Sequence, residues 1–156
     1  MIRIAVFPGS FDPFTIGHES IVRRAESLFD KIIIAIGRNS GKNSLLSIEN
    51  RIKLIGDVFI DNDNISVRSY NGLTVDFCKE VNAQYLLRGL RTAADFEYER
   101  AISQVNKVMK PDVESVFLLT LPEHTPINST IIRDILFHKG DARKFLPQGI
   151  DIKNYL

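Results

Sequence analysis

Short runs of apolar, mostly β-branched residues alternate along the chain with longer segments in which apolar residues recur every three or four positions. The runs predict strands and the periodic segments predict amphipathic helices. The expected strands cover 2–7, 31–36, 65–69, 85–87 and 115–120. The expected helices cover 48–59, 73–81, 93–109 and 129–137, with a first helix on the stripe Ile21, Val22, Ala25, Leu28 and Phe29 and a short last one at 141–145.

Strand–helix alternation with short connections predicts an α/β fold, a doubly wound, Rossmann-like parallel sheet with helices on both faces. In such sheets, ligands bind beyond the carboxyl ends of the strands, where the strand order reverses. Residues that carry chemistry should therefore follow strands. The length of 156 residues fits a single domain, 1–156, that can bury a sizeable core.

The overall charge and the single cysteine narrow the function classes. A formal charge of +1 provides no global field for nucleic acid or a membrane surface, so anion chemistry must come from a local cluster. Cys78 stands alone, which excludes an internal disulfide and a cysteine-based metal cluster, and its apolar context predicts a small buried hydrophobe. No apolar run reaches membrane-spanning length, and we expect a cytoplasmic protein.

The first candidate motif is Pro8-Gly9-Ser10-Phe11-Asp12-Pro13-Phe14-Thr15-Ile16-Gly17-His18, which runs from the first strand into the first helix. Gly9 allows close backbone approach to a ligand, and Ser10 offers a hydroxyl there. Free N–H groups and the dipole at a helix start attract phosphate. A histidine at that place can donate to a phosphoryl oxygen as charge develops. A turn with a solvent-facing histidine is the alternative.

The second motif is Gly37-Arg38-Asn39-Ser40-Gly41-Lys42. A P-loop needs four residues between its glycines and Ser or Thr after the lysine. Here three residues separate the glycines and Asn43 follows, so we reject a P-loop. What remains is a polar loop that brings Lys42 to the end of a strand, or else a solvated surface lysine.

The third motif, over 88–99, is Arg-Gly-Leu-Arg followed by Asp-Phe-Glu-Tyr-Glu. Arg88 and Arg91 flank Gly89 directly after a predicted strand, where guanidinium forks suit phosphate oxygens. Asp95 and Glu99 share one face of the following helix. An ordinary Arg91–Asp95 surface pair is the alternative.

The fourth motif is Pro126-Ile127-Asn128-Ser129-Thr130-Ile131-Ile132-Arg133. Asn128, Ser129 and Thr130 are good N-cap residues, so the segment predicts a helix start. The functional interpretation places its hydroxyls and free N–H groups on phosphates.

The four motifs in register resemble the phosphopantetheine adenylyltransferases of the nucleotidylyltransferase superfamily. Residues 15–18 are similar to the signature His-x-Gly-His, with the threonine that is common at the first position in this branch. Residues 127–133 are similar to Ile-Ser-Ser-(Ser/Thr)-x-x-(Arg/Lys), with Asn128 in place of the first serine. The segment 88–99 is the most diagnostic part of the resemblance, which spans nearly the whole chain.

The resemblance implies transfer of the adenylyl group of ATP to 4'-phosphopantetheine by direct in-line attack, giving dephospho-coenzyme A and pyrophosphate. It further implies Mg²⁺ brought with ATP, a homohexamer, and coenzyme A as a feedback inhibitor. No dedicated protein metal ligands are expected.

The resemblance also assigns roles to residues. His18 would stabilise the transition state at the α-phosphate, with Lys42 and Arg91 as its catalytic companions. The nucleotide side would comprise Gly9, Ser10, Phe11, His18, Gly89, Arg91, Glu99, His124, Asn128, Ser129 and Thr130. The acceptor side would comprise Ser10, Lys42, Thr74 and Arg88.

Two other functions compete with this one. A superfamily member that acts on nicotinamide mononucleotide or a phosphorylated alcohol would share most motifs, although the segment 88–99 disfavours it. A nucleotide-sensing domain would bind ATP without releasing pyrophosphate. A dehydrogenase is disfavoured because no Gly-x-Gly-x-x-Gly follows the first strand. The roles of His124, Arg133, Asp134 and the tail 148–156 stay open.

Overall fold

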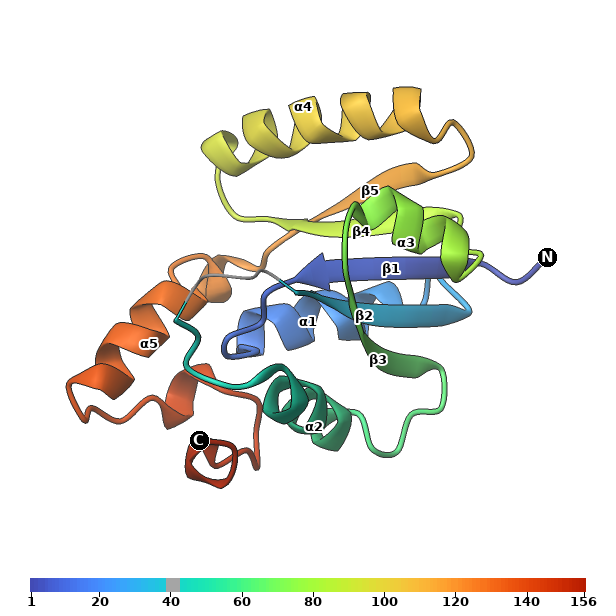
Figure 1. Ribbon diagram of the computed structural model, residues 1–156. Helices are drawn as coiled ribbons and strands as arrows, with labels where there is room; N and C mark the ends of the chain where they lie inside the picture. The colour runs from blue at the N-terminus through green and yellow to red at the C-terminus, as the bar shows by residue number, and fades with distance from the viewer. Residues whose placement is uncertain (39–42) are drawn as a thin grey trace.

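A five-stranded, all-parallel sheet forms the centre of the molecule (Figure 1). The computed structural model describes residues 1–38 and 43–156. The strands are β1 (Ile4–Gly9), β2 (Lys31–Gly37), β3 (Ile65–Tyr70), β4 (Tyr85–Leu90) and β5 (Glu114–Leu119). The α-helices are α1 (Ile16–Ala25), α2 (Ile48–Val58), α3 (Thr74–Glu80), α4 (Ala93–Met109) and α5 (Ser129–Phe137). Short 3₁₀ turns lie at Pro122–His124, Arg143–Phe145 and Ile152–Asn154.

The strand order is β3-β2-β1-β4-β5, which makes β1 the central strand. The chain winds outward from β1 to β3, crosses back to β4 on the other side of β1, and then winds outward again to β5. The order therefore reverses between β1 and β4, and a crevice is expected beyond the carboxyl ends of these two strands. The predicted fold class is confirmed.

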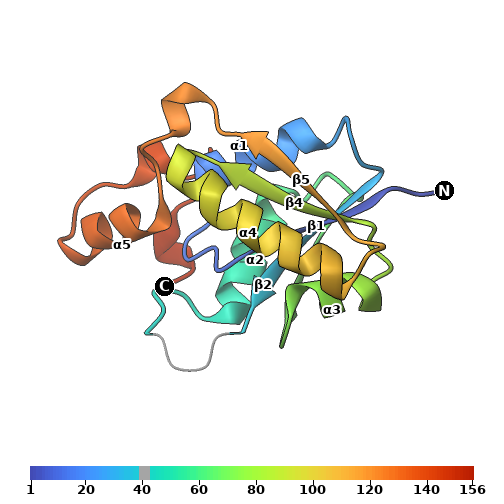
Figure 2. The same ribbon diagram turned by 90° about the horizontal axis from the view of Figure 1, so that it is seen from above.

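Both faces of the sheet are covered, as Figure 2 shows for α4 on one side and α1 on the other. The alternation of side chains along β2 explains why. Ile32, Ile34 and Ile36 join a buried cluster with α1, α2 and α5, whereas Ile33 and Ala35 join a second cluster with α3. A strand buried on both faces needs the continuous apolar run that the sequence shows there.

The structure corrects several predicted boundaries. β1 begins at Ile4 rather than Ile2, and α1 ends at Ala25, so Phe29 is buried outside the helix. The last predicted helix, 141–145, is only the 3₁₀ turn Arg143–Phe145. β4 continues past residue 87 to Leu90, because its outer residues pair with β5 through Leu119.

Two further features concern the core and the tail. Cys78 is buried as predicted, and burial raises the pKa of its thiol to about 11. Tyr155 in the C-terminal segment is buried and donates from its hydroxyl to Asp57 at 2.7 Å, so the tail packs onto α2.

Among the described residues, no helix combines the length and apolar character required to cross a membrane.

Candidate active site

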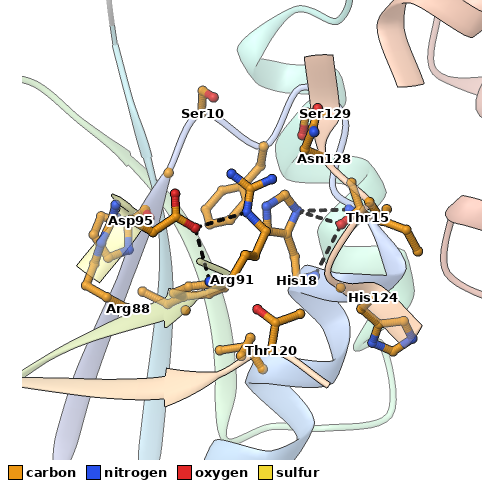
Figure 3. Close-up of a pocket in the computed structure, with 18 of the residues that line it drawn as sticks. Ser10, Thr15, His18, Arg88, Arg91, Asp95, Thr120, His124, Asn128 and Ser129 are labelled. Carbon is orange, nitrogen blue, oxygen red and sulfur yellow. Dashed lines mark hydrogen bonds and ion pairs between the residues drawn. The ribbon is translucent and has the colours of Figure 1, made fainter. Parts of the chain in front are cut away.

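A cavity of about 370 Å³ opens beyond the carboxyl ends of β1 and β4, where the strand order reverses (Figure 3). Its wall is built from the β1–α1 loop, the start of α1, the end of β4, the first turns of α4 and the start of α5. All the residues that the resemblance assigned to the nucleotide side line it, namely Gly9, Ser10, Phe11, His18, Gly89, Arg91, Glu99, His124, Asn128, Ser129 and Thr130. We call this space the β1/β4 cavity.

The His18 ring is fixed by the start of its own helix. Thr15 is the N-cap of α1, and its hydroxyl accepts the His18 N–H at 3.2 Å. In return, the Thr15 backbone N–H donates to Nδ1 of His18 at 3.0 Å, which completes a capping box. Because Nδ1 acts as the acceptor, the proton of the neutral ring lies on Nε2, and Nε2 remains free to donate to a ligand.

The electrostatics of the site keep His18 neutral. Burial lowers its pKa to about 3, and the neighbouring cations Arg91 and Arg88 act in the same direction. A neutral ring with its proton on Nε2 is a hydrogen-bond donor without a full charge. Bound phosphates would oppose the two arginines and favour the charged form.

Each arginine of the third motif is held by a carboxylate of α4. Arg91 lies with its Nε 3.3 Å from Asp95 Oδ2, and its backbone N–H donates to the same oxygen at 3.0 Å. The Arg91–Asp95 pair considered from the sequence therefore exists, and it lines the cavity. Arg88 forms a two-pronged ion pair with Glu99, with Nε 2.9 Å from Oε2, and also donates to the Pro8 carbonyl at 2.8 Å.

The Arg88–Glu99 pair stands between two cavities. Both residues line the β1/β4 cavity and also a neighbouring space of about 800 Å³ near Tyr70 and Thr74, which we call the β3-side cavity. The resemblance put Glu99 on the nucleotide side and Arg88 on the acceptor side, whereas in the structure they form one unit facing both. Arg88 and Gly89 lie within β4 rather than after it, which corrects the sequence prediction.

The start of α5 presents free backbone donors to the β1/β4 cavity. Asn128 is the N-cap and accepts the Ile131 N–H at 2.9 Å. The N–H groups of Ser129 and Thr130 have no hydrogen-bond partner within the described ranges 1–38 and 43–156. The Ser129 hydroxyl, by contrast, donates to the Pro13 carbonyl at 2.8 Å, so it ties α5 to the β1–α1 loop. Backbone groups rather than that hydroxyl are the available anion ligands here.

Two residues of the first motif have roles that sequence reasoning missed. Phe11 has a positive φ of 48° and a buried ring, which lies edge-on to the His18 ring at 5.0 Å. A Cβ on Gly9 would lie 2.8 Å from the Phe11 ring. Packing within the protein therefore requires a glycine at position 9, whether or not a ligand approaches its backbone.

The acceptor-side residues are only partly brought together. Ser10 lines both cavities, and Thr74 lines the β3-side cavity, where its hydroxyl is 2.7 Å from the Tyr70 hydroxyl. Lys42 lies outside the described residues. Thr120 and Ile127 also line the β1/β4 cavity and were not singled out from the sequence. The position of Thr120 directly after β5 was the available signal.

One residue of the cavity wall, His124, has a buried polar atom without a partner in the described part of the chain. His124 Nδ1 makes no hydrogen bond to any residue that the structure describes. Such an atom is costly unless a ligand or water satisfies it. No group of three or more His, Cys, Asp or Glu side chains in the described part of the chain is arranged to hold a metal ion.

A crevice at the sheet's switch point, with two arginines, a fixed histidine and a free helix start, defines a nucleotidyltransferase site. The comparisons agree. Residues 6–135 match the model of the family described as cytidylyltransferase-like. A solved NMN adenylyltransferase/ADP ribose pyrophosphatase from Francisella tularensis has the same fold, with a TM-score of 0.74 and 18% identity over 98% of this chain and 47% of that one.

Curated relatives give a narrower assignment. The phosphopantetheine adenylyltransferase of Cytophaga hutchinsonii is 53% identical over 96% of this chain and 100% of its own length. The enzyme of the same name from Leptospira biflexa is 51% identical over 96% of this chain and 94% of its own length. The chain therefore belongs to the phosphopantetheine adenylyltransferases, within the cytidylyltransferase-like family.

The lowered pKa of the part-buried His18 predicts a specific pH dependence of stability. The unfolded chain takes up a proton near the ordinary histidine pKa of 6.5, whereas folded His18 stays neutral down to about pH 3. Stability from this residue is thus full above about pH 6.5 and is lost progressively as the pH falls towards 3. His18→Gln, which keeps a capping box, should lose less unfolding free energy than the wild type between about pH 7.5 and 5.

Urea unfolding of both proteins at the two pH values measures this difference. His138→Gln serves as the control, because the side chain of His138 is exposed. An identical pH dependence in wild type and His18→Gln would contradict the assignment of a neutral His18 in the folded protein.

Proposed function

We propose that the protein transfers the adenylyl group of ATP to 4'-phosphopantetheine, giving dephospho-coenzyme A and pyrophosphate. The observation that carries the proposal is the meeting of two cavities at Ser10 and at the Arg88–Glu99 pair. A reaction that joins two phosphorylated molecules needs two adjoining spaces with cations at their junction. The relatives' name supplies the identity of the acceptor.

ATP would occupy the β1/β4 cavity. The free N–H groups of Ser129 and Thr130 and the α5 dipole suit the β- and γ-phosphates. Arg91 adds a charged donor on the opposite wall, oriented by Asp95. We assign the side of the cavity that His124 lines to the adenosine portion, because the resemblance puts His124 on the nucleotide side.

The acceptor would occupy the β3-side cavity. Its hydroxyl pair, Tyr70 and Thr74, and the apolar side chain of Ile102 suit an arm that alternates amide and methylene groups. Arg88 is the cation at the end nearer ATP, and Ser10 provides a hydroxyl at the same place. Lys42 would join them on the acceptor phosphate, as the resemblance implies.

The chemistry proposed is a direct in-line displacement. A non-bridging oxygen of the acceptor phosphate forms a bond to the α-phosphorus of ATP. The bond from that phosphorus to the oxygen of the β-phosphate breaks, and pyrophosphate leaves with the electron pair. No protein nucleophile takes part, since such transfers depend mainly on positioning and charge stabilisation. His18 Nε2–H would donate to an α-phosphate oxygen as negative charge builds up there.

The divalent cation would enter with ATP as part of the substrate. The carboxylates of the β1/β4 cavity, Asp95 and Glu99, are each committed to an arginine. Phosphate oxygens and water are therefore its expected ligands, which is the usual coordination of Mg²⁺ on nucleotides. A structure of the Francisella tularensis bifunctional enzyme was solved with AMP and a manganese ion, which supports the use of a divalent cation.

We further propose a cytoplasmic homo-oligomer, a hexamer by family resemblance, that is inhibited by coenzyme A. No residue of α4 is buried within the protomer, and Tyr98, Val105 and Val108 on it are exposed apolar side chains. Such a surface fits a subunit interface. Coenzyme A carries both a pantetheine arm and an adenosine, so it could span both cavities.

The activity is tested by pyrophosphate release from ATP and Mg²⁺ with 4'-phosphopantetheine, with nicotinamide mononucleotide, or with no acceptor. We expect release only with 4'-phosphopantetheine. Release only with another acceptor would keep the class of reaction and reject this substrate. Binding of ATP by folded protein without release in any arm would favour a nucleotide-sensing domain.

Removal of the proposed α-phosphate donor should slow turnover without unfolding the protein. In His18→Ala we expect kcat to fall by about a hundredfold or more, because one well-aimed donor to developing charge is lost. Steady-state kinetics measure the effect, and circular dichroism checks the fold. His138→Ala, on the exposed end of α5, should retain the wild-type kcat. A normal kcat in His18→Ala would reject the role given to His18.

A further inference from the structure

Arg51 on α2 is a buried arginine outside both cavities described above. The residue is 7% exposed. Its Nη1 donates to the Ser10 carbonyl at 2.8 Å, and its Nε donates to the Leu46 carbonyl at 3.1 Å. No carboxylate within the described ranges lies at ion-pairing distance from it. Burying a guanidinium that bonds only to backbone carbonyls costs free energy, because no carboxylate offsets its loss of hydration.

A second buried side chain ties the same two segments from the opposite direction. Asp12, in the β1–α1 loop, is 5% exposed. It accepts the Leu45 N–H at Oδ2 and the Leu46 N–H at Oδ1, both at 2.8 Å. The loop thus holds the N–H groups that precede α2, while α2 holds a carbonyl of the loop. We call Asp12 and Arg51, with these bonds, the loop clamp.

The atom that Arg51 holds belongs to the residue at the junction of the site. Ser10 lines the β1/β4 cavity, the β3-side cavity and a third cavity of about 460 Å³ that Arg51 itself lines. Ser10 is exposed, so packing does not fix its position. Among the described residues, Arg51 is the one whose side chain forms a hydrogen bond with the Ser10 backbone.

We propose that Arg51 is a positioning residue that sets where the two substrates meet, by fixing the Ser10 backbone through the loop clamp. This inference rests on the proposed function. In-line transfer requires the attacking oxygen and the α-phosphorus to be held in near-attack geometry, and a displacement of about 1 Å can cost about a hundredfold in rate. The proposed ATP ligands Arg91, Ser129 and Thr130 lie outside the two segments that Asp12 and Arg51 join.

Two substitutions separate positioning from packing. Arg51→Met keeps the apolar stem but removes every donor, so the Ser10 and Leu46 carbonyls lose their partner. Arg51→Lys keeps the charge but replaces the planar guanidinium by one ammonium group. That group cannot donate to the Ser10 and Leu46 carbonyls with the same geometry. Rates should therefore fall in the order wild type, Arg51→Lys, Arg51→Met.

The neighbouring residue on the same helix provides a matched control. Asn50 is partly buried, and its Nδ2 donates to the Tyr155 carbonyl at 2.8 Å, so it ties α2 to the C-terminal segment rather than to the site. Asn50→Ala removes a side-chain bond to backbone from α2 and should lower the melting temperature. It should leave kcat and the KM values for both substrates at the wild-type level.

The experiment measures kcat, the KM for the acceptor substrate, the Kd for ATP and the melting temperature in all four proteins. We expect Arg51→Met to lose about tenfold to a hundredfold in kcat, with a raised acceptor KM and an ATP Kd within about threefold of wild type. If Arg51→Met does not fold, Arg51→Lys serves as the test: its kcat should fall while its Kd for ATP stays close to the wild-type value.

The inference is overturned if folded Arg51→Met, or Arg51→Lys in its place, keeps the wild-type kcat and acceptor KM. It is also overturned if Asn50→Ala loses as much kcat as the Arg51 variants, because a general effect of destabilising α2 would then explain both. Failure of the proposed function is seen separately, since the wild type itself would then not use 4'-phosphopantetheine.

Discussion

The hydrogen bond from the Thr15 backbone to Nδ1 of His18 is the interaction on which the chemistry of this site depends. It selects the ring tautomer, points Nε2 away from the helix backbone and anchors the ring at the start of α1. The ring also lies against Phe11 and Phe14, which are buried in the same loop. A neutral donor is thereby held in place before any substrate arrives, which is the condition for effective stabilisation of developing charge.

The remaining charges are arranged around that fixed donor. Burial lowers the pKa of His18 most, and Arg91 and Arg88 lower it further, while Asp95 and Glu99 offset part of their charge and orient them. Partly exposed pairs of this kind contribute little to stability. Their value lies in pre-organisation, because arginines held in one rotamer lose less freedom when phosphates bind. The free N–H groups of α5 add a contribution that needs no side chain.

The sequence predicted the parts of the molecule that local rules govern. Strand runs such as 31–36 and the capped start of the helix at Ser129 follow from periodicity and N-cap chemistry, and both were correct. The predicted end of β4 at residue 87 was wrong. Arg88 and Gly89 are polar or small, and only their pairing with β5 makes them strand residues. Arg51 was missed for a related reason. It stands on a helix that was predicted from its apolar periodicity, and no local rule shows that a distant loop would offer a carbonyl to a charged residue there.

The residues that the resemblance assigned to the nucleotide side all line one cavity, because the first, third and fourth motifs meet at one edge of the sheet. Their pairing was not predictable: nothing in the spacing shows that Arg88 and Glu99 form one unit that faces two cavities. That unit depends on how α4 packs over β4, which is a tertiary property.

In the proposed mechanism, the acceptor phosphate attacks the α-phosphorus of ATP directly. The most direct test is the stereochemical course with ATP that carries a sulfur of known configuration at the α-phosphate. A single in-line displacement predicts inversion at phosphorus in the dephospho-coenzyme A product. Retention would require two displacements and a covalent enzyme intermediate, and it would contradict this account.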